Sequence, residues 1–168
     1  MLLCLFKAVV LGHRHKDKDT EKAEKAEYIV HGHKEVKMKR TGIQNGELIK
    51  ILATIGHTQT LVISDVGLPV PKGVQCIDLA LIAGIPSFVD VLDAVCNEFV
   101  FEAGILAEEL KEVNVEMYRF LEEKFSDIPL SFVPHETLKA LSEDSMVIIR
   151  TGETRSYCNI ILQAGVNF

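Results

Sequence analysis

Short apolar runs rich in β-branched residues alternate with amphipathic segments along residues 38–168, and this alternation restricts the chain to few folds. Residues 60–64 read TLVIS, which is typical of a buried strand. Residues 47–55 carry their apolar side chains at helical spacing, with Asn45 as the expected cap and Gly56 at the expected end. Strands that alternate with helices predict an α/β fold: a single domain with a mainly parallel sheet flanked by helices.

The rest of this region continues the alternation. Further helices are predicted at residues 87–95, 114–125 and 135–141. Further strands are predicted at residues 130–133, 146–150 and 159–162, with a less distinct one within residues 98–107. The prolines of residues 67–73 predict a rigid loop, because each proline restricts its own φ and the residue before it.

Residues 1–37 differ from the rest in charge. They carry eight Lys/Arg against six Asp/Glu, whereas residues 38–168 carry ten against eighteen. The pairs His13-x-His15 and His31-x-His33 could face a metal ion, but no third ligand is suggested nearby. We expect residues 1–37 to be a charged N-terminal extension, disordered or an over-extended start, and residues 38–168 to form the α/β domain.

Composition excludes several classes of function. The acidic body argues against a nucleic-acid partner, which would need a basic face. No apolar run is long enough for a membrane span, and the apolar start lacks the basic region and cleavage site of a signal peptide. The cysteines form no C-x-x-C pair, so they predict neither a zinc site nor a disulfide framework, and they fit a reducing compartment. We therefore expect a cytoplasmic protein.

Candidate site residues lie where predicted strands and helices begin or end. No phosphate-binding glycine motif, nucleophile elbow or zinc-protease motif is present. The polar residues left at these positions are His57, Asp65, His135, Tyr157 and Asn159. α/β folds place their ligands at such ends, and this set of side chains suits a neutral ligand with many hydroxyl groups.

Each candidate also has a purely structural interpretation. His57 could be a cation at a helix C-terminus rather than a proton donor. Asp65 could fold back onto its own turn, and His135 could be a polar residue at a helix start. Tyr157 and Asn159 flank a residue at the start of the last predicted strand, so alternation would point both to one face, where they could merely decorate an edge.

Short segments spread along residues 38–168 carry a family resemblance. They are residues 55–58, 64–71, 77–81, 84–88, 97–98, 107–111, 134–136, 149–153 and 157–166. In this order they resemble the ribose pyranase and fucose mutarotase family, over essentially all of residues 38–168 and nothing before them. The run Gly67-Leu68-Pro69-x-Pro71 is similar to the ribose branch of the family.

The resemblance implies an isomerase that interconverts β-D-ribopyranose and β-D-ribofuranose without a cofactor or metal. It implies that His57 is the proton donor and that Asp65, His135, Tyr157 and Asn159 bind the sugar. It also implies a ring-forming homo-oligomer, a decamer of two pentameric rings, with sites at subunit boundaries. Ribokinase, which consumes the furanose, would be a neighbour in the pathway rather than a bound partner.

One residue departs from the family pattern. The family usually reads Gly-His-Thr-Asp, whereas this chain has Gln59 at the last position. A neutral Gln59 would remove a nearby charge if the carboxylate tunes the histidine, but its amide could still cap the loop. Two alternatives stay open: a mutarotase for another sugar such as L-fucose, and a non-catalytic sugar-binding accessory protein.

Overall fold

The computed structural model describes residues 39–168, so the predictions for residues 1–37, both His-x-His pairs included, lie outside the described residues. A six-stranded sheet in the order β2-β5-β1-β6-β3-β4 forms the centre of the domain. The strands are β1 (Thr60–Ser64), β2 (Gln75–Asp78), β3 (Phe101–Ala107), β4 (Leu130–Val133), β5 (Val147–Arg150) and β6 (Ile160–Ala164).

Most of the sheet is parallel. β1 pairs with β5, β5 with β2 and β3 with β4 in parallel register. β6 is the exception, because it runs antiparallel to both of its neighbours, β1 and β3. The predicted α/β domain with a mainly parallel sheet is thus confirmed.

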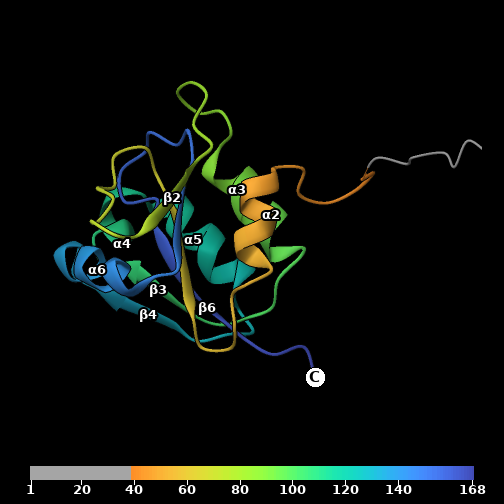
Figure 1. The fold of residues 1–168 in the computed structure, drawn as a ribbon. Helices are drawn as coiled ribbons and strands as arrows, with labels where there is room; N and C mark the ends of the chain where they lie inside the picture. Colours follow the sequence, from red (N-terminus) through yellow and green to blue (C-terminus); the bar gives the residue numbers. More distant parts are fainter. Residues whose placement is uncertain (1–38) are drawn as a thin grey trace, which may run out of the picture. The chain divides into compact units, whose positions relative to one another are not determined.

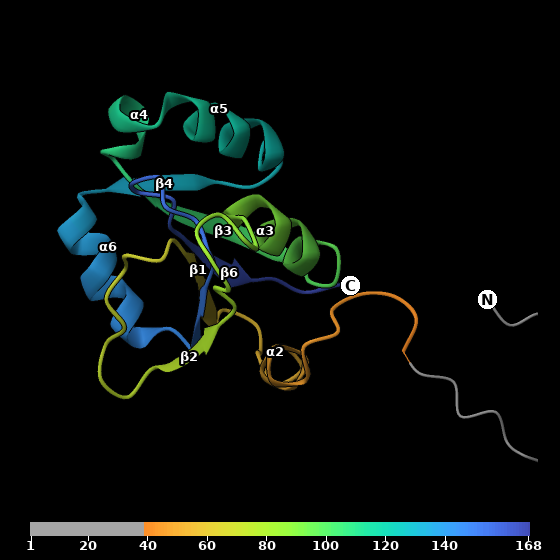
Figure 2. The same cartoon turned by 90° about the horizontal axis from the view of Figure 1, so that it is seen from above.

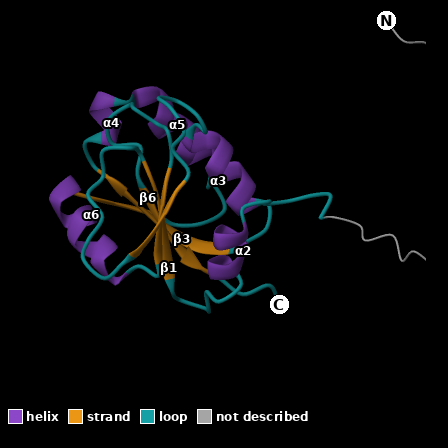
Figure 3. Cartoon of the chain, turned by 45° about the horizontal axis from the view of Figure 1, so that its top comes forward, coloured by secondary structure: helices purple, strands orange, loops and turns teal. Residues whose placement is uncertain are grey.

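Helices cover both faces of this sheet (Figures 2 and 3). They are α2 (Gly46–Leu52), α3 (Phe88–Cys96), α4 (Leu110–Val113), α5 (Val115–Lys124) and α6 (His135–Leu141), followed by the short helix η1 (Ser142–Asp144). α3, α4 and α5 lie on one face, and α6 lies on the other (Figure 2).

Strand alternation divides the core between these two faces. In β1, Leu61 and Ile63 pack with α2, α3 and α5, whereas Val62 packs with Leu138 of α6. All four of these side chains are fully buried. The sheet is thus covered on both sides, which explains why its central strands are continuous apolar runs.

Local signals place most of the element boundaries. Asn45 caps α2 by accepting from Leu48 N, and Asn114 caps α5 by accepting from Met117 N. Ser87 begins α3 in a capping box with Asp90, since each side chain bonds the other residue's backbone N–H. The predicted helices at residues 87–95, 114–125 and 135–141 are confirmed within one residue at each end.

Several details of the expected pattern are wrong or missing, among them the short helix α4, which was not predicted. Gly56 does not end α2, which already stops at Leu52 with Ala53 as its C-cap. The strand β2 was not predicted, because its QCID sequence is short and only one of its residues is buried. β6 begins at Ile160, so Asn159 precedes the strand.

A loop of residues 80–86 projects beyond the sheet between β2 and α3, at the top of Figure 1. We call it the apolar arm, because Leu81, Ile82 and Ile85 are 77%, 62% and 52% exposed. The arm folds back on itself through an antiparallel bridge between Ile82 and Ile85. Gly152 holds its base, donating from its N–H to Pro86 O at 2.8 Å.

Candidate functional site

Asp65 lies directly after β1, at the carboxyl end of the strand, and is 8% exposed. Its Oδ1 accepts from Gly67 N at 2.9 Å and from Leu68 N at 3.0 Å, so the side chain does fold back onto its turn. Burial raises the pKa of this carboxyl, while hydrogen bonds from Asn159, Gly67 and Leu68 oppose that rise. The turn interpretation is therefore confirmed, but it accounts for only one of the two carboxylate oxygens.

Asn159 engages the other carboxylate oxygen. Its Nδ2 donates to Asp65 Oδ2 at 2.9 Å, and its Oδ1 accepts from Asp65 N at 3.0 Å. Asn159 is 1% exposed, so this two-bond pair is buried and joins the end of β1 to the start of β6. The pair fixes the orientation of both side chains relative to the sheet.

Tyr157 and Asn159 do lie on one side, although the expected reason is wrong. Neither residue belongs to β6, and Tyr157 has a φ of 62°, in the left-handed region. A tight turn rather than strand alternation brings the Tyr157 ring beside that of His135. The two rings meet edge to face with 5.0 Å between their centroids.

His135 opens α6, as the Pro134-His135 pattern indicates. Its backbone N–H donates to both carboxylate oxygens of Glu109, at 3.0 and 3.1 Å. Its ring nitrogen Nδ1 is buried and has no hydrogen-bond partner within residues 39–168. Hydrogen bonds thus hold the backbone of His135 at the start of α6, whereas its imidazole keeps one buried nitrogen, Nδ1, without a partner among the described residues.

These four residues line one hollow of about 250 Å³. Its lining consists of Asp65, Gly67, Leu68, His135, Ser156, Tyr157 and Asn159. Sequence patterns alone did not place Gly67, Leu68 and Ser156 here as ligand-facing residues. A hollow with a carboxylate, an amide, a phenol and an imidazole can hydrogen-bond several hydroxyl groups of one small ligand.

Glu153 organises the loop that carries Tyr157 and Asn159. It is 4% exposed, and its Oε1 accepts from the backbone N–H groups of Thr154 and Arg155 at 3.0 and 2.9 Å. Arg155 also bonds it through Nε at 3.0 Å and through a terminal guanidinium nitrogen at 2.8 Å. These bonds lower the pKa of Glu153 to about 2.

His57 lies elsewhere, before the amino end of β1. The turn that carries it is closed by Gln59, whose Oε1 accepts from Gly56 N at 2.7 Å. Gln59 therefore caps the loop through its amide, which was one of the two roles left open for this position. α2 ends five residues earlier, at Leu52, so the interpretation of His57 as a cation at that helix terminus is wrong.

The ring of His57 contacts a carboxylate that sequence patterns did not single out. His57 Nε2 lies 3.0 Å from Glu102 Oε2, and Gln163 Nε2 donates to Glu102 Oε1 at 2.6 Å. The His57 bond, followed by that of Gln163, lowers the pKa of Glu102. No local motif could have indicated this contact, because 45 residues separate the two partners in sequence.

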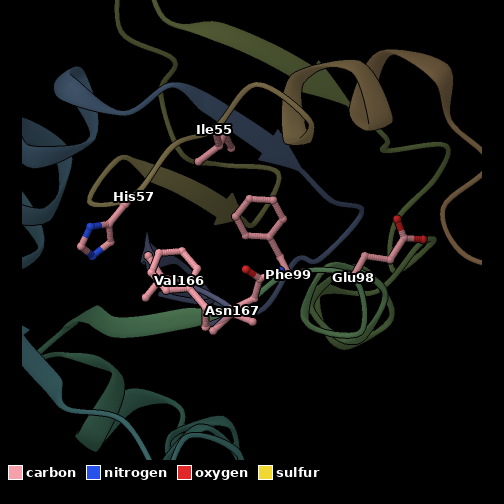
Figure 4. Close-up of a pocket in the computed structure, with 9 residues that line it drawn as sticks. Ile55, His57, Glu98, Phe99, Val166 and Asn167 are labelled. Atoms are coloured by element: carbon pink, nitrogen blue, oxygen red, sulfur yellow. The ribbon is translucent and has the colours of Figure 1, made fainter.

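A second and larger depression, of about 540 Å³, borders His57. Figure 4 shows His57 and Glu98 on opposite sides of it, with Phe99 and Val166 between them. Its other lining residues are Ile55, Val100, Gly165 and Phe168, with the polar Asn167 among them. The four candidate residues of the smaller hollow do not line this larger depression.

Within one chain, His57 is therefore separated from the other four candidates. It precedes β1 while Asp65 follows it, and five strand residues span roughly 16 Å. One sugar-sized ligand cannot touch both groups of the same subunit.

Two further features are absent from the described region. Within residues 39–168, no three His, Cys, Asp or Glu side chains gather closely enough to hold a metal ion. In the same range, no helix combines the length and apolar character that crossing a membrane requires.

Comparisons with known proteins extend this description. A D-ribose pyranase of Geobacillus thermodenitrificans is 50% identical over 131 residues, which cover 78% of this chain and 99% of that protein. The structure of Bacillus subtilis RbsD complexed with D-ribose matches with a TM-score of 0.75 and 48% identity, covering 78% of this chain and 100% of that one.

A fucose mutarotase from Streptococcus pneumoniae, solved in complex with L-fucose, also matches, with a TM-score of 0.63 over 74% of this chain and 94% of that one. At 20% identity, this likeness concerns the fold alone. The model of the RbsD / FucU transport protein family matches residues 38–167. That match spans well over half of the chain, and the chain therefore belongs to the RbsD / FucU transport protein family.

Proposed function

We propose that the protein is a D-ribose pyranase, which interconverts β-D-ribopyranose and β-D-ribofuranose. The observation that carries the proposal is the hollow in which Asp65, His135, Tyr157 and Asn159 come together. Relatives named D-ribose pyranase share about half of their residues with this chain over nearly their full length. A family member in this identity range has been solved with D-ribose bound.

Ring-size exchange needs two proton transfers to open the ring and two more to close it. The pyranose opens when its ring oxygen gains a proton and its anomeric hydroxyl loses one, so that the bond from the anomeric carbon to the ring oxygen breaks and an aldehyde forms. The aldehyde rotates, and a different hydroxyl attacks the same carbon with the reverse transfers. In this proposal, His57 is the proton donor to the ring oxygen.

The hollow holds the sugar while it is open. Asp65 and Asn159 are fixed by their mutual hydrogen bonds, so they offer preoriented groups to the hydroxyls. The unsatisfied Nδ1 of His135 supports the same role, because a hydroxyl in this hollow would supply its missing partner. Tyr157 contributes its phenol from the neighbouring wall.

A second copy of the chain completes the site in this proposal. His57 and the sugar hollow lie at opposite ends of β1, so the two can meet only head to tail between neighbouring subunits. Repeated head-to-tail contacts generate a closed ring when the rotation between subunits closes. We therefore propose a ring-forming homo-oligomer. Its expected form is a decamer of two pentameric rings.

Exposed apolar side chains at both ends support such a contact. The apolar arm lies at the carboxyl end of the sheet and presents Leu81, Ile82 and Ile85. At the other end, around His57, Val100 and Val166 are 48% and 39% exposed. Apolar groups of this size on two separate surfaces are typical of surfaces that another protein covers.

The cellular setting belongs to the same proposal. The enzyme would act in the cytoplasm and supply furanose to ribokinase, a neighbour in the pathway. Neither a cofactor nor a nucleic-acid partner is part of the reaction. Residues 1–37 are proposed to be an extension without chemistry, next to a catalytic domain of residues 38–168.

Saturation-transfer NMR of ribose tests this function. The β-pyranose anomeric proton is irradiated, and the β-furanose signal is followed with and without protein. We expect wild-type protein to accelerate the transfer and His57→Ala to lose about 10²–10⁴-fold of it, because proton transfer to the ring oxygen is then lost. Binding, followed through ribose line broadening, should survive in His57→Ala and weaken in His135→Ala.

The same experiment separates the alternatives. Acceleration for L-fucose but not for ribose would replace the proposal with a mutarotase for that sugar. Ribose broadening without accelerated transfer would indicate a binding accessory protein. Equal rates for His57→Ala and wild type would remove His57 from the mechanism.

A further inference from the structure

Both oxygens of the Glu102 carboxylate are occupied by neighbouring side chains. Oε2 lies 3.0 Å from His57 Nε2, and Oε1 accepts from Gln163 Nε2 at 2.6 Å. The side chains of His57 and Glu102 are 51% and 36% exposed. A contact this exposed to solvent contributes little to stability, so it has little value as a fold-stabilising bridge.

A β-bulge aims Glu102 at His57. Phe101 pairs with Ala164 and Ala103 pairs with Gln163, so Glu102 is the extra residue in β3. Bulges of this kind reorient a side chain and are common beside active sites. Gly165 packs against the bulge, since a Cβ at that position would lie 3.3 Å from Glu102 Cβ.

The turn that carries His57 is hydrogen-bonded to β6, and the same strand also bonds the side chain of Glu102. Thr58 N donates to Ala164 O at 3.0 Å, and Ala164 N donates to Gln59 O at 2.9 Å. Gln163, the preceding residue of β6, bonds Glu102. One strand therefore sets the position of both the imidazole and the carboxylate.

The direction of the hydrogen bond determines which ring nitrogen stays available. A carboxylate only accepts hydrogen bonds, so His57 must donate to Glu102 from Nε2–H. In the neutral imidazole the other nitrogen, Nδ1, is then unprotonated and carries the lone pair. When the ring takes up a proton, that proton sits on Nδ1.

We infer that Glu102 is a positioning residue, which holds His57 as its Nε2–H tautomer so that the proton passed to and from the sugar travels through Nδ1. Gln163 secures Glu102 in this role. The inference rests on the proposed function of His57, but the tautomer itself is a property of the protein without sugar. It also assigns the carboxylate beside the histidine to Glu102, and leaves Gln59 with its capping bond.

The test pairs two matched charge removals, Glu102→Gln and Glu98→Gln. Glu98 borders the same depression but lies across it from His57 (Figure 4). Its carboxylate accepts from Ile43 N, a bond that a glutamine oxygen can keep. Glu98→Gln therefore removes the same charge without touching the imidazole.

Two readouts are taken on each protein. The ring ¹⁵N shifts of His57, recorded without sugar, report its tautomer, and ribose exchange reports kcat and KM. We expect an Nε2–H tautomer in wild type and Glu98→Gln. Glu102→Gln should show a mixed or reversed tautomer and a kcat lowered about 10²-fold at unchanged KM. Gln163→Ala should lower kcat less, in the same direction.

Outcomes against the inference are distinct from outcomes against the proposed function. An Nδ1–H tautomer in wild type, or a wild-type kcat in Glu102→Gln, would overturn the positioning role. A merely structural role would lower the thermal stability of Glu102→Gln and leave tautomer and kcat unchanged, which would also overturn it. If wild type showed no exchange, the proposed function would fail, while the ¹⁵N shifts would still decide the tautomer.

Discussion

At the scale of single residues, two buried carboxylates, Asp65 and Glu153, hold the loops around the smaller hollow. Asp65 is held by the amide of Asn159 and by two backbone N–H groups of its own turn. Burial nevertheless raises its pKa, so this carboxyl accepts a proton more readily than an exposed aspartate would. Glu153 is the opposite case, because charged and backbone donors surround it and its pKa falls to about 2.

Glu153 gives a stability prediction whose sign follows from that pKa. The ionised form is favoured by folding, so its contribution is fully present above pH 4.5, the ordinary value of the group, and is lost as pH falls toward about 2. Glu153→Gln should lower the free energy of unfolding by about 1–3 kcal/mol at neutral pH. Urea unfolding at several pH values measures the difference.

The control is Glu123→Gln, which removes an exposed carboxylate of α5. Its stability should follow that of wild type at every pH. The gap between wild type and Glu153→Gln should narrow as the pH approaches about 3. A gap of constant size across this range would show that the charge of Glu153 contributes nothing to folding.

Residue patterns single out the candidates one by one, whereas only the family resemblance predicts that four of them form a group. Strand and helix ends single out Asp65 and His135, because polar groups gather there in α/β folds. Their convergence depends on a pairing with Asn159 across 94 residues of sequence, which no local pattern encodes. The contact of Glu102 with His57 was still harder to predict, because the orientation of Glu102 depends on a bulge in the β3–β6 ladder.

At the scale of elements, the strands and helices with strong local signals were predictable and β2 was not. TLVIS forms β1 as expected because it is buried on both faces, and Ser87 begins α3 through its capping box. β2 forms through its parallel pairing with β5, which is a tertiary effect. The antiparallel direction of β6 is likewise set by its neighbours rather than by its own sequence.

The apolar arm depends on a close approach that only glycine permits. A Cβ on Gly152 would lie 2.5 Å from Ile85 N and 2.6 Å from Ile82 O, which are backbone atoms with little room to move. Gly152→Ala should therefore displace the arm and lower the free energy of unfolding by about 1–3 kcal/mol. Urea unfolding measures the cost, and the methyl NMR signals of Ile82 and Ile85 report the displacement.

Gly46→Ala is the matched control, because nothing lies within 4 Å of the added Cβ at the start of α2. It should leave stability unchanged or raise it by up to about 1 kcal/mol. Wild-type stability and unshifted Ile82 and Ile85 signals in Gly152→Ala would contradict the close packing of the arm.

At the scale of the whole molecule, the proposed reaction needs groups that one subunit keeps apart. The hollow lined by Asp65 and Asn159 lies at the carboxyl end of β1, and His57 lies before the amino end of that strand. A strand is rigid, so no plausible side-chain motion joins the two within a single chain. The proposed reaction therefore requires a site shared between copies, with the imidazole of one facing the hollow of the next.

Complementation between two inactive variants tests that sharing most directly. His57→Ala and His135→Ala are co-expressed with different tags, and mixed assemblies are purified through both tags and assayed for ribose exchange. Each variant alone should be inactive or nearly so. Random mixing of equal amounts should restore about a quarter of the wild-type activity, because that share of subunit boundaries combines an intact His57 with an intact His135. Mixed assemblies as inactive as the separate variants would contradict a shared site.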